Sequence, residues 1–227
     1  MAYILHIDTS GSIGLVAISK DGKAVSEITE SDTRNHASSI NLNIEEALKQ
    51  ADITMQQLDA VSVCGGPGSY TGLRIGLATA KGICYILDKP LMMHNKLTLL
   101  ATSIAYGNNE NKHIISILQA RENEYFCAVY DLQLNELLPP KHHHVDELEG
   151  LLSPYIENAI FTGSIDEIIS SIAGKQHAPT VESSHPQLDD RCRYAEERFK
   201  CNDFVNLAYA EPFYLKQVYT HKPKNSK

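Results

Sequence analysis

The chain has 227 residues, of which 43% are hydrophobic and 21% charged, and its formal net charge is −8 at pH 7. This length is enough for one large domain or two small ones, each with its own core. The acidic balance argues against a protein that binds nucleic acid alone, because phosphate binding requires clustered Lys and Arg. Residues 1–104 contain ten acidic and eight basic residues (net −2), and residues 105–227 contain eighteen and twelve (net −6). The uneven split indicates two regions with different surfaces.

The sequence lacks the usual marks of export, of membrane insertion and of a disulfide or zinc framework. The longest apolar stretch, residues 73–87, contains Arg74 and Lys81, and the first eight residues have no basic region and end on Asp8. The five cysteines are an odd number and include no Cys-x-x-Cys pair. We therefore expect a cytoplasmic location, no membrane contact, no bound metal and reduced thiols.

The first half of the chain shows alternating strand and helix signals. Three strands are predicted over 3–8, 13–19 and 23–30, separated by glycine-containing turns. Apolar residues at 40, 44, 47, 48 and 51 have helical spacing and predict a helix. A buried strand over 60–64 leads into a glycine-rich turn, and a helix over 71–87 ends before Lys89-Pro90. A strand over 90–94 and a helix over 97–106 complete a first lobe, residues 1–106.

Weaker signals follow a polar break at residues 107–112. Strands are predicted over 113–119 and 125–130, with a loop or edge strand over 137–144. A short strand over 159–162, a helix over 165–173 and a last helix through 201–210 follow. We therefore predict a second α/β lobe over residues 107–227.

The turn from Gly65 to Gly72 is the most informative segment. A strand that passes through a glycine-rich turn into a helix directs backbone N–H groups at one spot, which suits an anion. It is not a Walker A loop, because no Gly-Lys-[Ser/Thr] follows, and its glycine spacing is one residue too long for the dinucleotide fingerprint. Two interpretations stay open: a tight turn with Ser69 or Thr71 capping the helix, and a nucleotide-phosphate site. The candidate phosphate contacts are Asp8, Thr9, Ser10, Gly66, Gly68 and Ser69.

The helix after this turn is apolar on nearly every side, which predicts burial on every side. Small residues recur along it every four positions, and a lobe of this size covers only one face of such a helix. The other face is covered either by the rest of the chain or by a partner protein, whose helices would form a bundle with it. The predicted partner interface comprises Ile40, Leu42, Ile44, Gly72, Gly76, Ala80 and Cys84.

Residues 66–76, Gly-Pro-Gly-Ser-Tyr-Thr-Gly-Leu-Arg-Ile-Gly, resemble the signature of the TsaB (YeaZ) family. Shorter matches are residues 7–10 (Ile-Asp-Thr-Ser), His36 at the start of the first helix, residues 120–125 (Ala-Arg-x-x-Glu-Tyr) and residues 210–216 (Ala-x-Pro-x-Tyr-Leu-Lys). Gln119 stands where the family commonly has Asp, and Lys216 where it commonly has Arg.

This resemblance implies an α/β fold of the actin/Hsp70-like (ASKHA) superfamily, with two RNase H-like lobes of mixed sheets flanked by helices, the second lobe degenerate. It also implies a subunit of the bacterial complex that forms N6-threonylcarbamoyladenosine at position 37 of tRNAs. Such a subunit is a non-catalytic scaffold that pairs with the catalytic TsaD subunit and recruits the TsaE ATPase. We expect a homodimer when the chain is alone, tRNA contact only within the complex, and no cofactor, although ATP or ADP could bind in the assembly.

Two patterns bear on whether the chain is an enzyme. The catalytic paralogue carries two His at i, i+4 on its first helix, which can hold a metal from one helix face, whereas here His36 is followed by Ile40. His-Glu-x-x-His occurs nowhere, which excludes a metalloprotease of that type. We therefore expect no catalytic residues. Two alternative functions stay open: an enzyme that binds and hydrolyses ATP through Asp8 and the 65–72 turn, and a module that recognises tRNA directly. For Asp8 there is also a purely structural alternative, in which its side chain closes an Asx-type turn.

Overall fold

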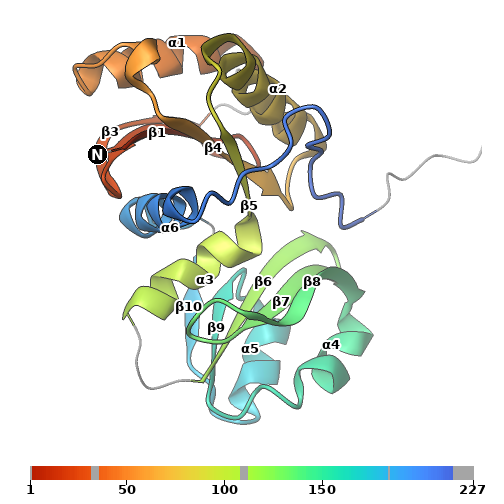
Figure 1. Cartoon of the computed structure of the whole chain (residues 1–227). Helices are drawn as coiled ribbons and strands as arrows, with labels where there is room; N and C mark the ends of the chain where they lie inside the picture. The colour runs from red at the N-terminus through yellow and green to blue at the C-terminus, as the bar shows by residue number, and fades with distance from the viewer. Residues whose placement is uncertain (1, 32–35, 108–111, 184, 217–227) are drawn as a thin grey trace, which may run out of the picture.

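The computed structural model describes residues 2–31, 36–107, 112–183 and 185–216, and its fold is built on two five-stranded mixed sheets (Figure 1). The first sheet has the order β3-β2-β1-β4-β5. β1 pairs antiparallel with β2 and parallel with β4. The strands are β1 (Tyr3–Asp8), β2 (Gly14–Lys20), β3 (Lys23–Glu30), β4 (Ala60–Gly66) and β5 (Leu91–Asn95).

Helices cover both faces of this sheet (Figure 1). On the outer face lie α1 (His36–Gln50) and α2 (Tyr70–Leu87), which bury the larger core of the lobe against β1, β2 and β4. A single 3-10 turn, η1 (Met55–Gln57), precedes β4. The inner face is covered by α6 (Leu188–Lys200), which packs on a small core that includes Ile4 and Met92. Next to α6 lies α3 (Lys96–Gly107), which also contacts the second sheet.

The second sheet repeats the topology of the first, with the order β10-β9-β6-β7-β8. Its strands are β6 (His113–Arg121), β7 (Glu124–Tyr130), β8 (Glu136–His144), β9 (Ala159–Gly163) and β10 (Thr180–Glu182). The helices on its outer face, α4 (Val145–Leu152) and α5 (Glu167–Gly174), have eight residues each, far fewer than α1 and α2. The predicted fold of two mixed-sheet lobes with a reduced second lobe is confirmed.

The end of the chain differs from the prediction. The last helix in the described part of the chain is α6, and residues 201–210, where a helix was predicted, are turns and irregular backbone. The periodicity of apolar residues missed α6 because Arg191 and Glu196 are among the residues that it buries. Asn202 also has a φ of +55°, which is incompatible with a continuing helix. α4 and β10 were not predicted.

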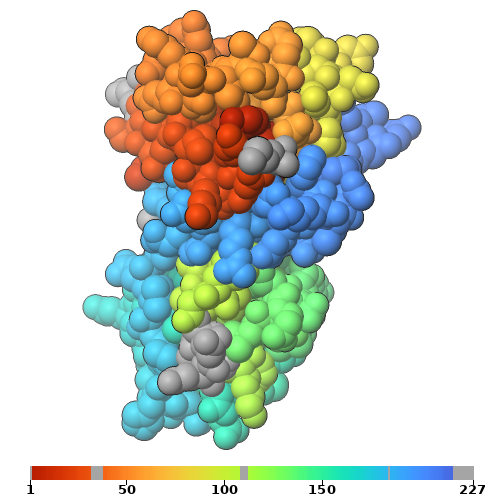
Figure 2. All heavy atoms as spheres, turned by 60° about the vertical axis from the view of Figure 1, so that its left-hand side comes forward, coloured from red at the N-terminus to blue at the C-terminus, as the bar shows by residue number. Residues whose placement is uncertain are grey.

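The C-terminal part of the chain returns to the first lobe. α6 contacts β1, β3 and β5, and the amide N–H groups of Val205 and Phe213 donate to the carbonyls of Leu91 and Gly65. In Figure 2 the blue atoms of this part lie between the red and orange atoms of the first lobe and the green second lobe. The sheets change near residue 107, although most of the polar break lies outside the described residues. Two separately folding units, 1–106 and 107–227, stay a prediction. Among the described residues no helix is long and apolar enough to cross a membrane.

Candidate functional site

The glycine-rich turn packs directly against the turn that follows β1. The hydroxyl of Thr9 donates to the carbonyl of Gly72 (2.6 Å), and the amide of Ser69 donates to the carbonyl of Ser10 (2.7 Å). A Cβ atom on Gly68 would lie 2.3 Å from the Ser10 carbonyl oxygen, and one on Gly72 would lie 1.9 Å from that of Thr9. Glycine is required at these positions because two backbones meet without room for a side chain.

The start of α2 is capped from within the chain. The side chain of Ser69 accepts a hydrogen bond from the amide of Gly72 (3.2 Å), so the predicted serine cap is confirmed. The structure brings all six candidate phosphate contacts together around this point. Most of their polar groups already make hydrogen bonds within the chain: the Thr9 hydroxyl donates to the Gly72 carbonyl, and the Ser10 hydroxyl donates to Asp8.

Asp8 is held in a buried ion pair. One carboxylate oxygen accepts from the amide (2.9 Å) and the hydroxyl (2.6 Å) of Ser10. The other accepts from Nη1 of Arg191 on α6 (3.0 Å). Burial by itself raises the pKa of Asp8, but the charges of Arg191 and Lys96 and the Ser10 hydrogen bonds outweigh it, so the pKa lies below its ordinary value.

These contacts test whether Asp8 fits a magnesium-bound nucleotide. A magnesium ion takes carboxylate oxygens as ligands in a near-octahedral shell, yet both oxygens of Asp8 already have donors and the guanidinium of Arg191 occupies the side on which the cation would sit. The residues therefore do not fit a metal ion at Asp8. Within the described part of the chain, no group of three or more His, Cys, Asp or Glu is arranged to hold one.

The small-residue stripe of α2 faces the chain's own sheet. Gly72, Gly76, Ala80 and Cys84 are all buried, and a Cβ on Gly76 would lie 2.5 Å from Oγ1 of Thr9 and 3.4 Å from a methyl of Ile7. Ile40 and Ile44 are likewise part of the first-lobe core. The prediction that these six residues form a partner interface is therefore wrong: the small side chains let α2 approach β1 and β4 closely, and Ile40 and Ile44 pack into the core of the lobe.

The opposite face of α2 is exposed and largely apolar around residues 78–86, whereas on α1 Leu42 is the one large apolar residue on a polar exposed face. Of the predicted interface residues only Leu42 is exposed, at 66% of its surface. On α2, Tyr85 and Ile86 are each 80% exposed, and an added Cβ at Gly82 would meet no atom within 4 Å. α1 and α2 lie side by side on the outside of the first lobe (Figure 1). We call this surface, formed by Leu42, Ala78, Gly82, Tyr85 and Ile86, the outer helix face.

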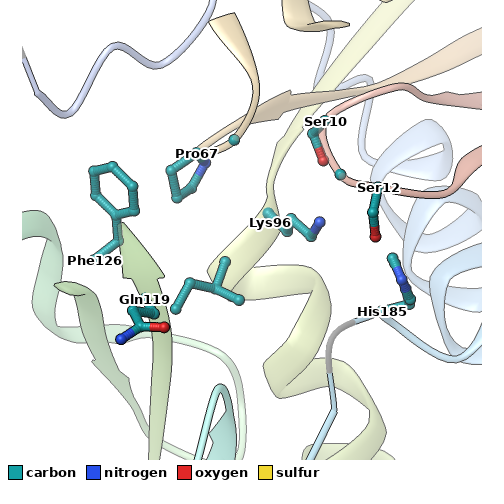
Figure 3. Close-up of a pocket in the computed structure, with 10 residues that line it drawn as sticks. Ser10, Ser12, Pro67, Lys96, Gln119, Phe126 and His185 are labelled. Carbon is teal, nitrogen blue, oxygen red and sulfur yellow. The ribbon is translucent and has the colours of Figure 1, made fainter. Parts of the chain in front are cut away.

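A cavity between the lobes contains residues that the sequence analysis missed. It is lined by the turn after β1, by Lys96 at the start of α3 and by His185, with Gln119 of β6 on the opposite wall (Figure 3). Arg191 lies 183 positions from its partner Asp8, and it could not be predicted because ion pairing between residues distant in sequence leaves no local pattern.

Lys216, which like Gln119 departs from the family pattern, pairs with Glu124 of β7.

The comparisons with known proteins agree with this architecture. A family model described as TsaD, tRNA N6-adenosine threonylcarbamoyltransferase, matches residues 23–186. The chain is 26% identical over 224 residues to the tRNA threonylcarbamoyladenosine biosynthesis protein TsaB of Escherichia coli, covering 94% of each chain. A stretch of 78 residues, 34% of this chain and 22% of the relative, is 42% identical to the tRNA N6-adenosine threonylcarbamoyltransferase of Clostridium perfringens.

Solved structures show the same fold. A Pseudomonas aeruginosa protein described as similar to peptidase YeaZ superposes with a TM-score of 0.79 at 21% identity, covering 95% of this chain and all of the other. The ROK hexokinase of Thermus thermophilus superposes with a TM-score of 0.51 at 10% identity, covering 86% and 99%. The chain therefore belongs to the family of the TsaD model and, within it, to the TsaB (YeaZ) proteins of the ASKHA superfamily.

Proposed function

We propose that this chain is a non-catalytic scaffold subunit in the cytoplasmic formation of N6-threonylcarbamoyladenosine at position 37 of tRNAs. It pairs with a TsaD-like catalytic subunit through the outer helix face, and the pair recruits a TsaE-like ATPase. Alone, the same face supports a homodimer. The names of the relatives, the TsaB protein of Escherichia coli and the threonylcarbamoyltransferase of Clostridium perfringens, support the pathway.

The observation that carries the partner surface is the exposure of Tyr85 and Ile86 on α2, with Leu42 exposed on the neighbouring α1. Tyr85 and Ile86 are each 80% exposed and adjacent, and contiguous exposed apolar surface is typical of interaction sites. Around them α2 is smooth, since Ala78 and Gly82 add little bulk. A smooth apolar face beside a second helix suits packing against two helices of another protein.

The non-catalytic role is supported by what Asp8 and Ile40 do. Asp8 is bound by Arg191 and Ser10, and Ile40, at the position of the second helix histidine of the catalytic paralogue, is buried in the core at 3% exposure. Neither position offers a metal ligand. We therefore do not extend the proposal to ATP hydrolysis through Asp8 and the 65–72 turn.

Size-exclusion chromatography of the full chain with its TsaD-like subunit tests the interface. Ile86→Glu places a charge in the outer helix face and should abolish co-elution while circular dichroism stays native. Leu137→Glu, on the second lobe at a side chain 39% exposed, is the matched control and should leave the complex intact. Undisturbed co-elution of Ile86→Glu would show that the interface lies elsewhere.

Reconstitution of the tRNA modification tests the role itself. The catalytic subunit, the ATPase and a supply of threonylcarbamoyl-adenylate are combined with and without this chain, and the modified nucleoside is measured. We expect modification only when the chain is present, and equal modification with Asp8→Asn if that variant is folded. Tight retention of tRNA on filters by this chain alone at physiological salt would contradict the scaffold role, because it would make the chain the tRNA-binding component.

A further inference from the structure

A second groove lies between the lobes, beside the cavity of Figure 3, with which it shares Pro67, Gly68 and Phe126. Its volume is about 390 Å³, and its other walls are the start of α2, the β6–β7 hairpin and residues 213–216. None of the described residues that line it is acidic, although the whole chain has a net charge of −8. The groove therefore suits a neutral or negatively charged ligand.

Aromatic rings form much of this groove. Phe126 and Phe213 are half-buried in its walls. Tyr70 and Tyr214 are 41% and 40% exposed, and their ring centroids lie 5.2 Å apart with the planes inclined by 33°. The guanidinium of Arg74 lies 4.2 Å from the centroid of Tyr70, and its Nε donates to the Tyr214 hydroxyl (3.0 Å). These contacts hold the two tyrosine rings in place while both stay partly open to solvent.

The cations at the groove differ in how far they are neutralised. Lys216 pairs with Glu124, which His142 also contacts. The guanidinium of Arg121, on the β6–β7 hairpin, is exposed and has no hydrogen bond or ion pair with any residue that the structure describes. Arg74 has no carboxylate partner within the described part of the chain. Two guanidinium groups are thus available to an anionic ligand.

We propose that this groove binds unpaired nucleotides of the tRNA, with bases stacked on the two tyrosine rings and phosphates beside Arg121. Single-stranded nucleic acid is bound by this combination of aromatic or guanidinium planes under the bases and cations along the backbone. An acidic protein segment would neutralise the arginines but would leave the exposed ring faces without a stacking partner, so the observations favour RNA. The groove admits single nucleotides and excludes a double helix. In naming tRNA, the proposal rests on the function proposed above.

The groove adjoins the outer helix face. Arg74 and Ala78 are four residues apart on α2, so they lie on the same side of the helix. RNA in the groove therefore lies beside the catalytic subunit of the proposed pair. In this arrangement an acidic chain adds a local contact to RNA that the assembly holds mainly elsewhere.

Fluorescence anisotropy of a labelled oligoadenylate with the full chain tests the proposal without any other subunit. A duplex RNA of the same length is the comparison for base stacking, and a polyglutamate peptide is the comparison for a protein ligand. Tyr214→Ala removes a ring, Tyr214→Phe keeps it, and Arg121→Gln removes a charge. The matched controls are Tyr209→Ala, at a tyrosine 83% exposed and outside the groove, and Lys141→Gln, at an exposed lysine of β8.

We expect saturable binding of oligoadenylate at low salt, with the duplex and the peptide binding more weakly. Tyr214→Ala should weaken this binding about fivefold or more, the effect of losing one stacked base, whereas Tyr214→Phe and Tyr209→Ala should not. The logarithm of the binding constant should fall with the logarithm of the salt concentration, with a slope of about −0.7 for each neutralised phosphate. Arg121→Gln should make this slope less steep by about 0.7, and Lys141→Gln should leave it unchanged.

The absence of saturable binding, tighter binding of the duplex or of the peptide than of oligoadenylate, or unchanged binding by Tyr214→Ala or Arg121→Gln would each overturn the proposal. If Tyr214→Ala does not fold, Arg121→Gln decides the outcome. The TsaD-like subunit takes no part in this test, so a failure of co-elution would count against the proposed pairing alone. A failure of RNA binding would count against the groove alone.

Discussion

Replacing Arg191 by Met probes the buried ion pair that joins α6 to β1. Nη1 of Arg191 lies 3.0 Å from Oδ2 of Asp8, and the two side chains are 1% and 6% exposed. At this distance and an effective dielectric constant of about 20, their attraction is about 5 kcal/mol. Breaking a buried pair from one side costs about 3–5 kcal/mol, because an unpaired charge stays behind. We expect Arg191→Met to lower the free energy of unfolding by this amount.

Urea unfolding at neutral pH measures this change. Arg193→Met is the control on the same helix, since Arg193 pairs with Glu197 at 3.1 Å with side chains 57% and 41% exposed. An exposed pair of this kind contributes less than about 1 kcal/mol. The double variant Asp8→Asn, Arg191→Met should recover part of the loss, because it leaves no buried charge unpaired. A cost for Arg191→Met no larger than that for Arg193→Met would refute the reasoning.

The dependence on pH supplies a second readout of the same pair. Because the native pKa of Asp8 lies below its ordinary value, the unfolded state binds the proton first as the pH falls. The stability that Asp8 contributes is therefore present above about pH 4 and lost on further acidification. Arg191→Met removes the largest of the influences that lower this pKa, so the variant should lose less stability in acid than the wild type. An identical acid dependence would contradict this account.

Other predictions concern single positions. Gly72→Ala should lower the free energy of unfolding by about 3 kcal/mol, the upper end of the usual cost of overpacking, because its Cβ would lie 1.9 Å from a carbonyl oxygen. Gly82→Ala, on the open side of the same helix, should instead raise the free energy of unfolding by about 0.5–1 kcal/mol. Urea unfolding of the two variants measures both changes. Ser69→Ala should lower the melting temperature through the loss of a helix cap that contributes about 1 kcal/mol. Cys201 is the exposed thiol, and burial raises the pKa of the other four cysteines to about 11 or 12, so a thiol reagent should label one residue per native chain.

Local patterns predicted most elements of the first lobe. The strands over 3–8 and 23–30 agree with β1 and β3 at both ends, and the helix predicted over 71–87 differs from α2 by one residue. The alternation of strand residues and the cap at Ser69 are properties of neighbouring residues, which a sequence displays directly. The topology of the second sheet followed from the family resemblance rather than from its own weaker signals.

The direction in which a helix faces is harder to predict. The stripe of Gly72, Gly76 and Ala80 is smooth, and a smooth face suits a partner helix as well as a strand of the same chain. The structure distinguishes the two because the turn after β1 places the Thr9 carbonyl against Gly72. Lys96 and Arg191 were missed for a related reason: their importance comes from burial next to residues far away in the sequence.

The return of α6 to the first sheet affects how the chain folds during synthesis. Arg191, the partner of the β1 carboxylate of Asp8, is synthesised 183 residues after it. Until then the inner face of the first sheet, including Ile4 and Met92, lacks the helix that covers it. The first lobe is therefore completed only after α6, which follows every strand of the second sheet, has been synthesised, so its folding cannot finish before the second sheet has been translated.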